Sequence, residues 1–115
     1  MFDLIVRSAT VVDPEKRTQR VADVAIENGR IALVEPVITG PAREELQAEG
    51  LVLQPGVIDT HLHLTASLSS HAMAARAGVT TAVDMAGPAG EVMAAAKVRG
   101  RGLNIAVLNA ILPEH

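Results

Sequence analysis

The spacing of apolar and polar residues divides the chain into two parts with different periods. Before residue 54 the apolar runs are short and are separated by turn residues, which is typical of β-strands. After Pro55, apolar runs of strand length alternate with longer helical stretches, which is typical of repeated strand–helix units. We therefore expect two domains, at residues 1–54 and 55–115.

The first part predicts a small antiparallel sheet that forms part of a β-sandwich. Asn28-Gly29 separates two apolar runs and predicts a two-residue hairpin, because both turn residues need positive φ. Asp13-Pro14 predicts another turn. Residues 41–48 are expected to form one helical turn or a charged loop. The strands are expected at residues 4–6, 9–12, 21–26, 31–34 and 51–53.

The second part predicts an α/β arrangement with parallel strands. Strand–helix alternation with short links implies parallel pairing and right-handed crossovers. Gly78 follows the first helical stretch and is expected to end it. The strands are expected at residues 57–61, 79–83 and 104–112, and the helices at residues 67–77 and 88–98.

This alternation predicts about the first three units of a TIM-type (β/α)8 barrel. A complete barrel of this type takes about 250 residues, whereas the whole chain has 115. Three open parallel strands do not make a finished core, because parallel sheets are covered on both faces. We therefore expect an incomplete barrel, as a fragment, a cleavage product or one part of a larger assembly.

Composition narrows the classes of function. Hydrophobic residues make up 49% and charged residues 20%, which is typical of a globular chain. A net charge of -3 predicts no nucleic-acid partner and no anionic membrane partner. The sequence has no cysteine, which excludes disulfides and thiolate metal sites. No signal peptide or long apolar run is visible, so we expect no membrane partner and a cytoplasmic location.

His61 and His63 end the first strand of the second part. Residues i and i+2 of a strand point to the same side, so both imidazoles are expected to face together. They stand at the carboxyl end of the strand, where barrel enzymes keep their active sites. An isolated His-x-His pair is usually a surface or core feature. Its place after Pro55-Gly56 and an apolar strand favours a site for a divalent metal, which neutral imidazole binds well.

Longer stretches around these histidines resemble a known family. Residues 55–63, Pro-Gly-Val-Ile-Asp-Thr-His-Leu-His, and residues 77–84, Ala-Gly-Val-Thr-Thr-Ala-Val-Asp, resemble the amidohydrolase superfamily. That family includes ureases, dihydroorotases, hydantoinases, adenine deaminases and D-aminoacylases. Residues 5–14 and 23–31 resemble the small β-sandwich that precedes the barrel in the family. The resemblance covers nearly the whole chain.

The resemblance implies that His61 and His63 bind the more buried metal. It implies one or two divalent ions, zinc first, with Fe, Ni or Mn as alternatives. The implied reaction is hydrolysis of a C–N bond in an amide, cyclic amide or amidine by metal-activated hydroxide. The remaining ligands and the general-base Asp are expected outside this chain.

Three further residues are candidates for the site. Asp59 faces the same side as His61 by alternation; it either orients a ligand imidazole or accepts a backbone hydrogen bond at the strand end. Asp84 ends the second strand and could touch substrate or a ligand, although a loop or cap contact is the commoner role. His115 follows the third strand and could reach the mouth of the pocket.

Three classes of function stay open at this point. The chain is part of an enzyme, a non-catalytic subunit or pseudo-enzyme piece completed by another chain, or a β-rich domain with incidental histidines. We expect the chain alone to be inactive, because catalytic zinc usually has three protein ligands. Expected partners are a small-molecule amide-type substrate and the remainder of the barrel or a partner chain. A homo-oligomer is also expected, because an open strand edge favours association.

Overall fold

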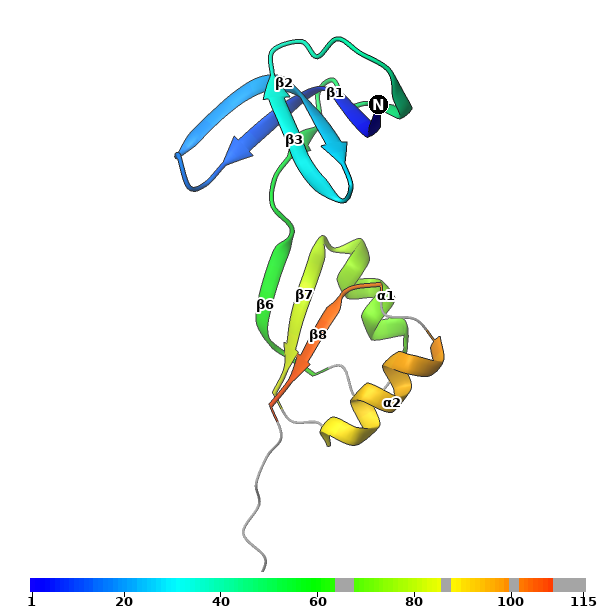
Figure 1. Ribbon diagram of the computed structural model, residues 1–115. Helices are drawn as coiled ribbons and strands as arrows, with labels where there is room; N and C mark the ends of the chain where they lie inside the picture. Colours follow the sequence, from blue (N-terminus) through cyan, green and yellow to red (C-terminus); the bar gives the residue numbers. More distant parts are fainter. Residues whose placement is uncertain (64–67, 86–87, 100–101, 109–115) are drawn as a thin grey trace, which may run out of the picture. The chain divides into compact units, whose positions relative to one another are not determined.

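The computed structural model describes residues 1–63, 68–85, 88–99 and 102–108 (Figure 1). The chain divides into two compact units, unit 1 at Met1–Pro55 and unit 2 at Gly56–His115. Within the described ranges, no helix is long and apolar enough to cross a membrane.

Unit 1 is a five-stranded mixed sheet in which β1 is the central strand. The path runs β3-β2-β1-β4, and β5 also pairs with β1. β1–β2 and β2–β3 are antiparallel, as expected, whereas β4 and β5 run parallel to β1. The prediction of an antiparallel sheet is therefore wrong for two strands. The strands are β1 (Phe2–Asp13), β2 (Thr18–Glu27), β3 (Arg30–Glu35), β4 (Ala42–Gln47) and β5 (Val52–Leu53).

Strand β4 corrects the expectation of a helical turn or charged loop at residues 41–48. Its residues pair in parallel with β1, from Phe2 opposite Ala42 to Arg7 opposite Gln47. All of β4 beyond Ala42 is exposed, and it lies at the end of the sheet path. Charged residues suit an edge strand because they discourage further pairing. The charged residues of this segment do not predict a strand, because pairing with β1 decides its conformation.

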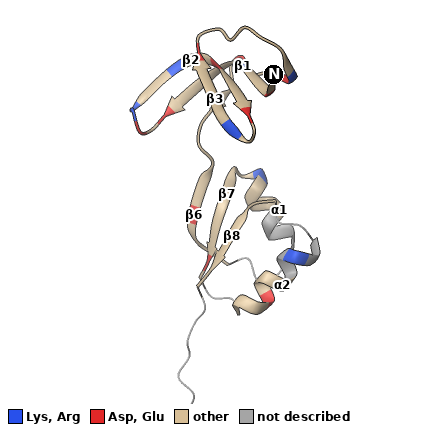
Figure 2. Cartoon of the chain, viewed as in Figure 1, with Lys and Arg blue, Asp and Glu red and all other residues tan. Residues whose placement is uncertain are grey.

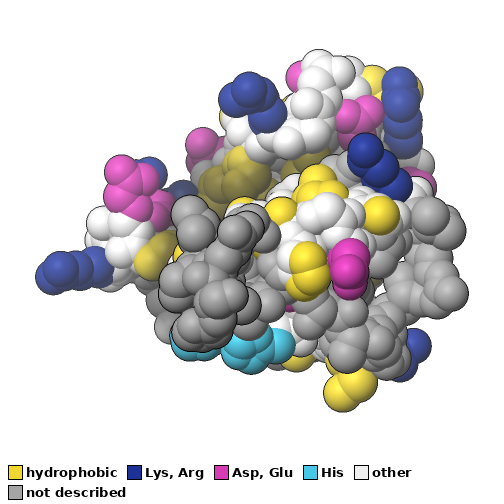
Figure 3. Space-filling view, turned by 90° about the horizontal axis from the view of Figure 1, so that it is seen from below, with side chains coloured by type: hydrophobic (Ala, Val, Ile, Leu, Met, Phe, Trp, Pro, Cys, Tyr) yellow, Lys and Arg dark blue, Asp and Glu magenta, His cyan; other side chains and the backbone are white. Residues whose placement is uncertain are grey.

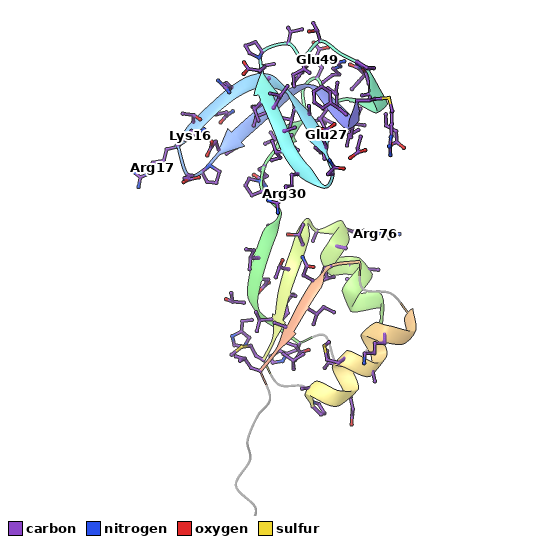
Figure 4. All side chains as sticks on the ribbon, viewed as in Figure 1. Lys16, Arg17, Glu27, Arg30, Glu49 and Arg76 are labelled. Atoms are coloured by element: carbon purple, nitrogen blue, oxygen red, sulfur yellow. The ribbon has the colours of Figure 1, made fainter. Side chains whose placement is uncertain are left out.

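A hairpin turn and a β-bulge shape the first three strands of unit 1. Asn28 and Gly29 have φ of 52° and 72°, which confirms the predicted hairpin between β2 and β3. Glu27 and Arg30 flank that turn (Figure 4). The expected strands at residues 4–6 and 9–12 are one strand, β1, whose pairing with β2 shifts between Val6 and Ala9. This irregularity is a β-bulge, and Ser8 within it has a φ of 55°.

Alternation along β1 and β2 gives unit 1 two packed faces. Val6 and Val24 anchor one face, and Ile5 and Ala25 anchor the other. The first cluster contains the buried residues Val6, Ala9, Val24 and Ala48, and the second contains Ile5, Ala25 and Ile38.

A polar network joins three strands of unit 1. The buried Asp23 carboxylate accepts hydrogen bonds from the backbone N–H groups of Ser8 (2.9 Å) and Ile38 (3.0 Å) and from the Arg7 guanidinium (2.8 Å). Arg7 also donates two hydrogen bonds to Glu45, at 3.0 and 2.6 Å. The N–H groups of Ile38 and Ser8 are the main cause of a lowered pKa of Asp23. Figure 2 shows charged residues along the strands and turns of this unit.

Unit 2 is a parallel sheet of strand order β6-β7-β8, with helices α1 and α2 on one side of it (Figure 1). The predicted alternation and the parallel pairing are confirmed. Gly78 follows α1 with a φ of 88°, the left-handed conformation expected at a helix end. The elements are β6 (Val57–Leu62), α1 (Leu68–Arg76), β7 (Val79–Asp84), α2 (Ala89–Arg99) and β8 (Asn104–Val107).

The core of unit 2 forms around Ala82 and Leu103. Ala74 and Ala75 of α1 pack against this pair, as do apolar residues of all three strands: Leu62, Val79 and Ile105. Within the described residues β8 ends at Val107, earlier than the expected limit of 112. Those ranges contain three parallel strands and no closed barrel.

Candidate metal centre

His61 and His63 lie at the carboxyl end of β6, the end where an α/β sheet keeps its ligands. Their ring centroids are 5.5 Å apart, and the ring planes meet at 77°. Both residues are exposed, and histidine side chains reach the surface in the space-filling view (Figure 3). The two imidazoles are therefore neighbours, open to solvent, at one end of the sheet.

The spacing of the rings fits two ligands of a single divalent ion. With Zn–N bonds of about 2.0–2.1 Å in tetrahedral geometry, the two ring centres would lie on the order of 5 Å apart. The observed separation of 5.5 Å is close to this value. The described residues contain no group of three or more His, Cys, Asp or Glu that could hold a metal. The pair by itself therefore falls short of the three protein ligands usual for catalytic zinc.

Asp59 acts on the backbone of His61. Its Oδ1 accepts a hydrogen bond from the His61 backbone N–H at 2.9 Å. This contact matches the backbone alternative for Asp59. The pairing of β6 with β7 also shifts between Asp59 and Leu62, so simple alternation does not run unbroken through this stretch. A role for Asp59 in orienting an imidazole stays a prediction.

Asp84 is the last residue of β7 and is fully buried. It pairs with Leu62, and the Met85 N–H donates to the Leu62 carbonyl at 3.0 Å. Asp84 therefore stands at the same end of the sheet as the histidines, because the carboxyl ends of parallel strands meet at one edge. A contact with substrate or metal stays a prediction. The remaining candidate, His115, lies outside the described residues.

Sequence reasoning missed a close contact that lies on the same strand pair. The sequence pattern marks Gly56 only as part of a domain boundary, and Thr80 only as part of the start of a strand. In the structure the missing side chain of Gly56 leaves the space that Thr80 occupies. The glycine next to Pro55 was the available signal, but only the paired strands show what approaches it.

Comparison with similar proteins shows the family to which the chain belongs. No protein-family model matches it. It is 41% identical over 75 residues to a dihydroorotase of Solibacter usitatus, and 42% identical over 99 residues to an adenine deaminase of Deinococcus radiodurans. These matches cover 65% and 76% of this chain, but 17% and 18% of those proteins. The chain thus spans about a fifth of the length of the curated relatives it matches.

Solved structures agree with these relatives. A D-aminoacylase, described for its binuclear metal centre, is 36% identical with a TM-score of 0.61, over 73% of this chain and 18% of that one. An N-acyl-D-glutamate deacylase from Bordetella bronchiseptica, complexed with zinc and a phosphonate inhibitor, has a TM-score of 0.75 over 95% of this chain and 29% of that one. At 22% identity the deacylase shows the fold alone. The chain therefore belongs to the amidohydrolase superfamily and matches the N-terminal part of its members.

Proposed function

We propose that the chain is the N-terminal part of a metal-dependent enzyme that hydrolyses a C–N bond in a small amide, cyclic amide or amidine. The observation that carries the proposal is the imidazole pair of His61 and His63 at the end of β6, with centroids 5.5 Å apart. Relatives named dihydroorotase and adenine deaminase support the bond type. The binuclear metal centre of the related D-aminoacylase supports a divalent ion.

His61 and His63 would hold the ion through neutral imidazole nitrogens, with zinc as the first choice and Fe, Ni or Mn as alternatives. A bound divalent ion would supply Lewis acidity toward the substrate and lower the pKa of a water molecule. Asp59 would keep the backbone of His61 in place through the hydrogen bond that it accepts. Further metal ligands and a proton-transferring Asp are proposed to lie outside the described residues, because two imidazoles are too few.

We also propose that residues 1–54 are the front part of a β-sandwich and residues 55–115 the first three units of a TIM-type barrel. The mixed sheet of unit 1 and the parallel strands of unit 2 support this division. Val57 and Ile58 of the edge strand β6 are 45% and 66% exposed. Such apolar exposure supports association with the remainder of the barrel, with another chain or with a second copy.

Metal binding tests the proposal directly. Zinc content of the complete native protein is measured by mass spectrometry after equilibrium dialysis, for the unchanged protein and for His61→Ala/His63→Ala. We expect at least about 100-fold weaker affinity in the double variant, since losing ligands costs more than the 10–100-fold typical of their hydrogen-bond partners. His71→Ala, a histidine change in α1, is the matched control and should keep the metal.

Two results would contradict the proposal. One is a native protein that binds no divalent ion, and the other is a double variant that binds it as tightly as before. The 115-residue chain by itself is expected to turn over no amide; steady hydrolysis that a chelator abolishes would contradict that expectation.

A further inference from the structure

Gly56 and Thr80 touch where β6 begins. A Cβ placed on Gly56 would lie 2.7 Å from the Thr80 Cβ, and closer still to the Thr80 Oγ1 and Cγ2 atoms. Real Cβ atoms essentially never come within 3.0 Å of another heavy atom. The Thr80 Cβ is fixed to its backbone, so rotating the side chain does not relieve the overlap. Any side chain at position 56 must therefore move one strand away from the other.

The need for glycine here is steric, not conformational. Gly29 and Gly78 have φ of 72° and 88°, the left-handed region that other residues avoid. Gly56 is not among the residues with positive φ. The space taken by the Thr80 side chain therefore excludes a side chain at this position.

Thr80 occupies this space because it is the extra residue of a bulge. Val57 pairs with Val79, whereas Ile58 pairs with Thr81, so Thr80 is left over on β7. The Val57 N–H donates to the Gly78 carbonyl at 2.9 Å, and the Thr80 hydroxyl donates to the Val57 carbonyl at 3.5 Å. The first residue of β6 is thus held by residues on both sides of Val79.

A second shift of opposite sense lies at the histidine end of β6. Pairs are 22 positions apart at Val57 and Val79, 23 apart at Asp59 and Ala82, and 22 apart again at Leu62 and Asp84. The extra residue is therefore on β7 at the first shift and on β6 at the second. His61 falls inside the second shift. Between the two shifts β6 pairs with β7 at an offset of 23, and the second shift returns the offset to 22 before Leu62 pairs with Asp84.

We propose that the close contact between Gly56 and Thr80 sets the register of β6 and so positions His61 and His63. Both are positioning residues, since neither touches the imidazoles. A one-residue slip in a strand turns every side chain to the opposite face. A lost register would therefore turn both imidazoles away from the divalent ion that they are proposed to bind. This inference rests on the proposed metal function.

The test compares Gly56→Ala with Gly90→Ala in the complete native protein. Gly90 lies in α2, and a methyl group added there would meet no atom within 4 Å beyond its chain neighbours and its own helix backbone, so alanine at this position is a control. Co²⁺ affinity and the Co²⁺ absorption spectrum, which reports ligand geometry, are measured for each. We expect Gly56→Ala to weaken binding by at least about tenfold and to change the spectrum, and Gly90→Ala to do neither. Unchanged Co²⁺ affinity and an unchanged spectrum in Gly56→Ala would overturn the proposal.

Removing the obstructing side chain provides the rescue. In a Thr80→Gly background, adding Gly56→Ala should cost no further affinity, because the three atoms nearest to the added methyl group are gone. This holds even where Gly56→Ala alone fails to fold, since the double variant should then fold and bind like Thr80→Gly. A double variant weaker than Thr80→Gly would overturn the proposal. Absence of Co²⁺ binding in the unchanged protein, or Co²⁺ binding that survives in His61→Ala/His63→Ala, would instead contradict the proposed metal site.

Discussion

Unit 1 and unit 2 hold their strands together by different means. In unit 1 a buried carboxylate, Asp23, joins the bulge of β1 to the segment at Ile38 and to Arg7. In unit 2 the first two strands meet through a close approach at Gly56 and a small apolar cluster around Ala82 and Leu103. Unit 1 therefore adds a buried charge to its two apolar clusters, whereas the geometry of the histidine strand depends on close steric fit.

Because of this difference, the two units should lose stability by different mechanisms when a residue is substituted. Loss of Asp23 leaves the buried N–H of Ile38 and the part-buried donors of Ser8 and Arg7 without their acceptor, and an unsatisfied buried group costs the full desolvation penalty. Loss of an apolar contact in unit 2 leaves a cavity whose cost grows with the volume removed. Changes in the two units should therefore be distinguishable by where protection of backbone amides is lost.

The largest effect is expected from Asp23→Ala. It leaves the N–H groups of Ser8 and Ile38 and the Arg7 guanidinium without their shared acceptor. We expect a loss of about 3 kcal/mol in unit 1, measured by hydrogen exchange of its amides. Glu44→Ala, an exposed change on β4, is the control and should stay within about 0.5 kcal/mol. Equal loss of protection in both units would break the distinction between them.

A smaller loss, confined to unit 2, is expected from Leu103→Ala. Leu103 is buried and packs with Ala82 against α1 and the strands. Truncation should cost about 2 kcal/mol, at the lower end for a buried leucine because the cluster is small. Leu108→Ala, at a residue that is 53% exposed, should change little by the same exchange measurement. If the two variants behave alike, the cluster contributes no specific stability.

Mild acid should act first on unit 1, with the smallest of the three effects. The pKa of Asp23 is lowered mainly by N–H donors of Ile38 and Ser8, and the pKa of Glu45 mainly by Arg7. A native pKa below the unfolded value gives stability that is fully present above about pH 4 and is lost as the pH falls toward the native pKa. Denaturant midpoints between about pH 6 and 2.5 should fall less steeply in Asp23→Asn. An unchanged slope would exclude Asp23 as a source of the pH dependence.

Residues with strong local preferences made most of the fold predictable. Asn28-Gly29 gave the hairpin, because few other residues adopt positive φ in succession. Gly78 gave the end of α1, and alternating strand and helix lengths gave the parallel order of unit 2. Strand β4 was not predictable in this way. Its charged residues suit a loop equally well, and its conformation follows from pairing with Phe2–Arg7.

The sequence likewise predicted part of the candidate site and left the rest to the tertiary structure. The sequence alone placed His61 and His63 two residues apart at the end of an apolar strand, a spacing that favours the same side of the strand for both side chains. Only the tertiary structure showed that Asp59 binds the His61 backbone, that Asp23 accepts hydrogen bonds from Ser8 and other donors, and that Thr80 fills the space beside Gly56. These contacts join residues through bulges and shifted registers. A bulge depends on how two strands fit, and neither strand carries that information by itself.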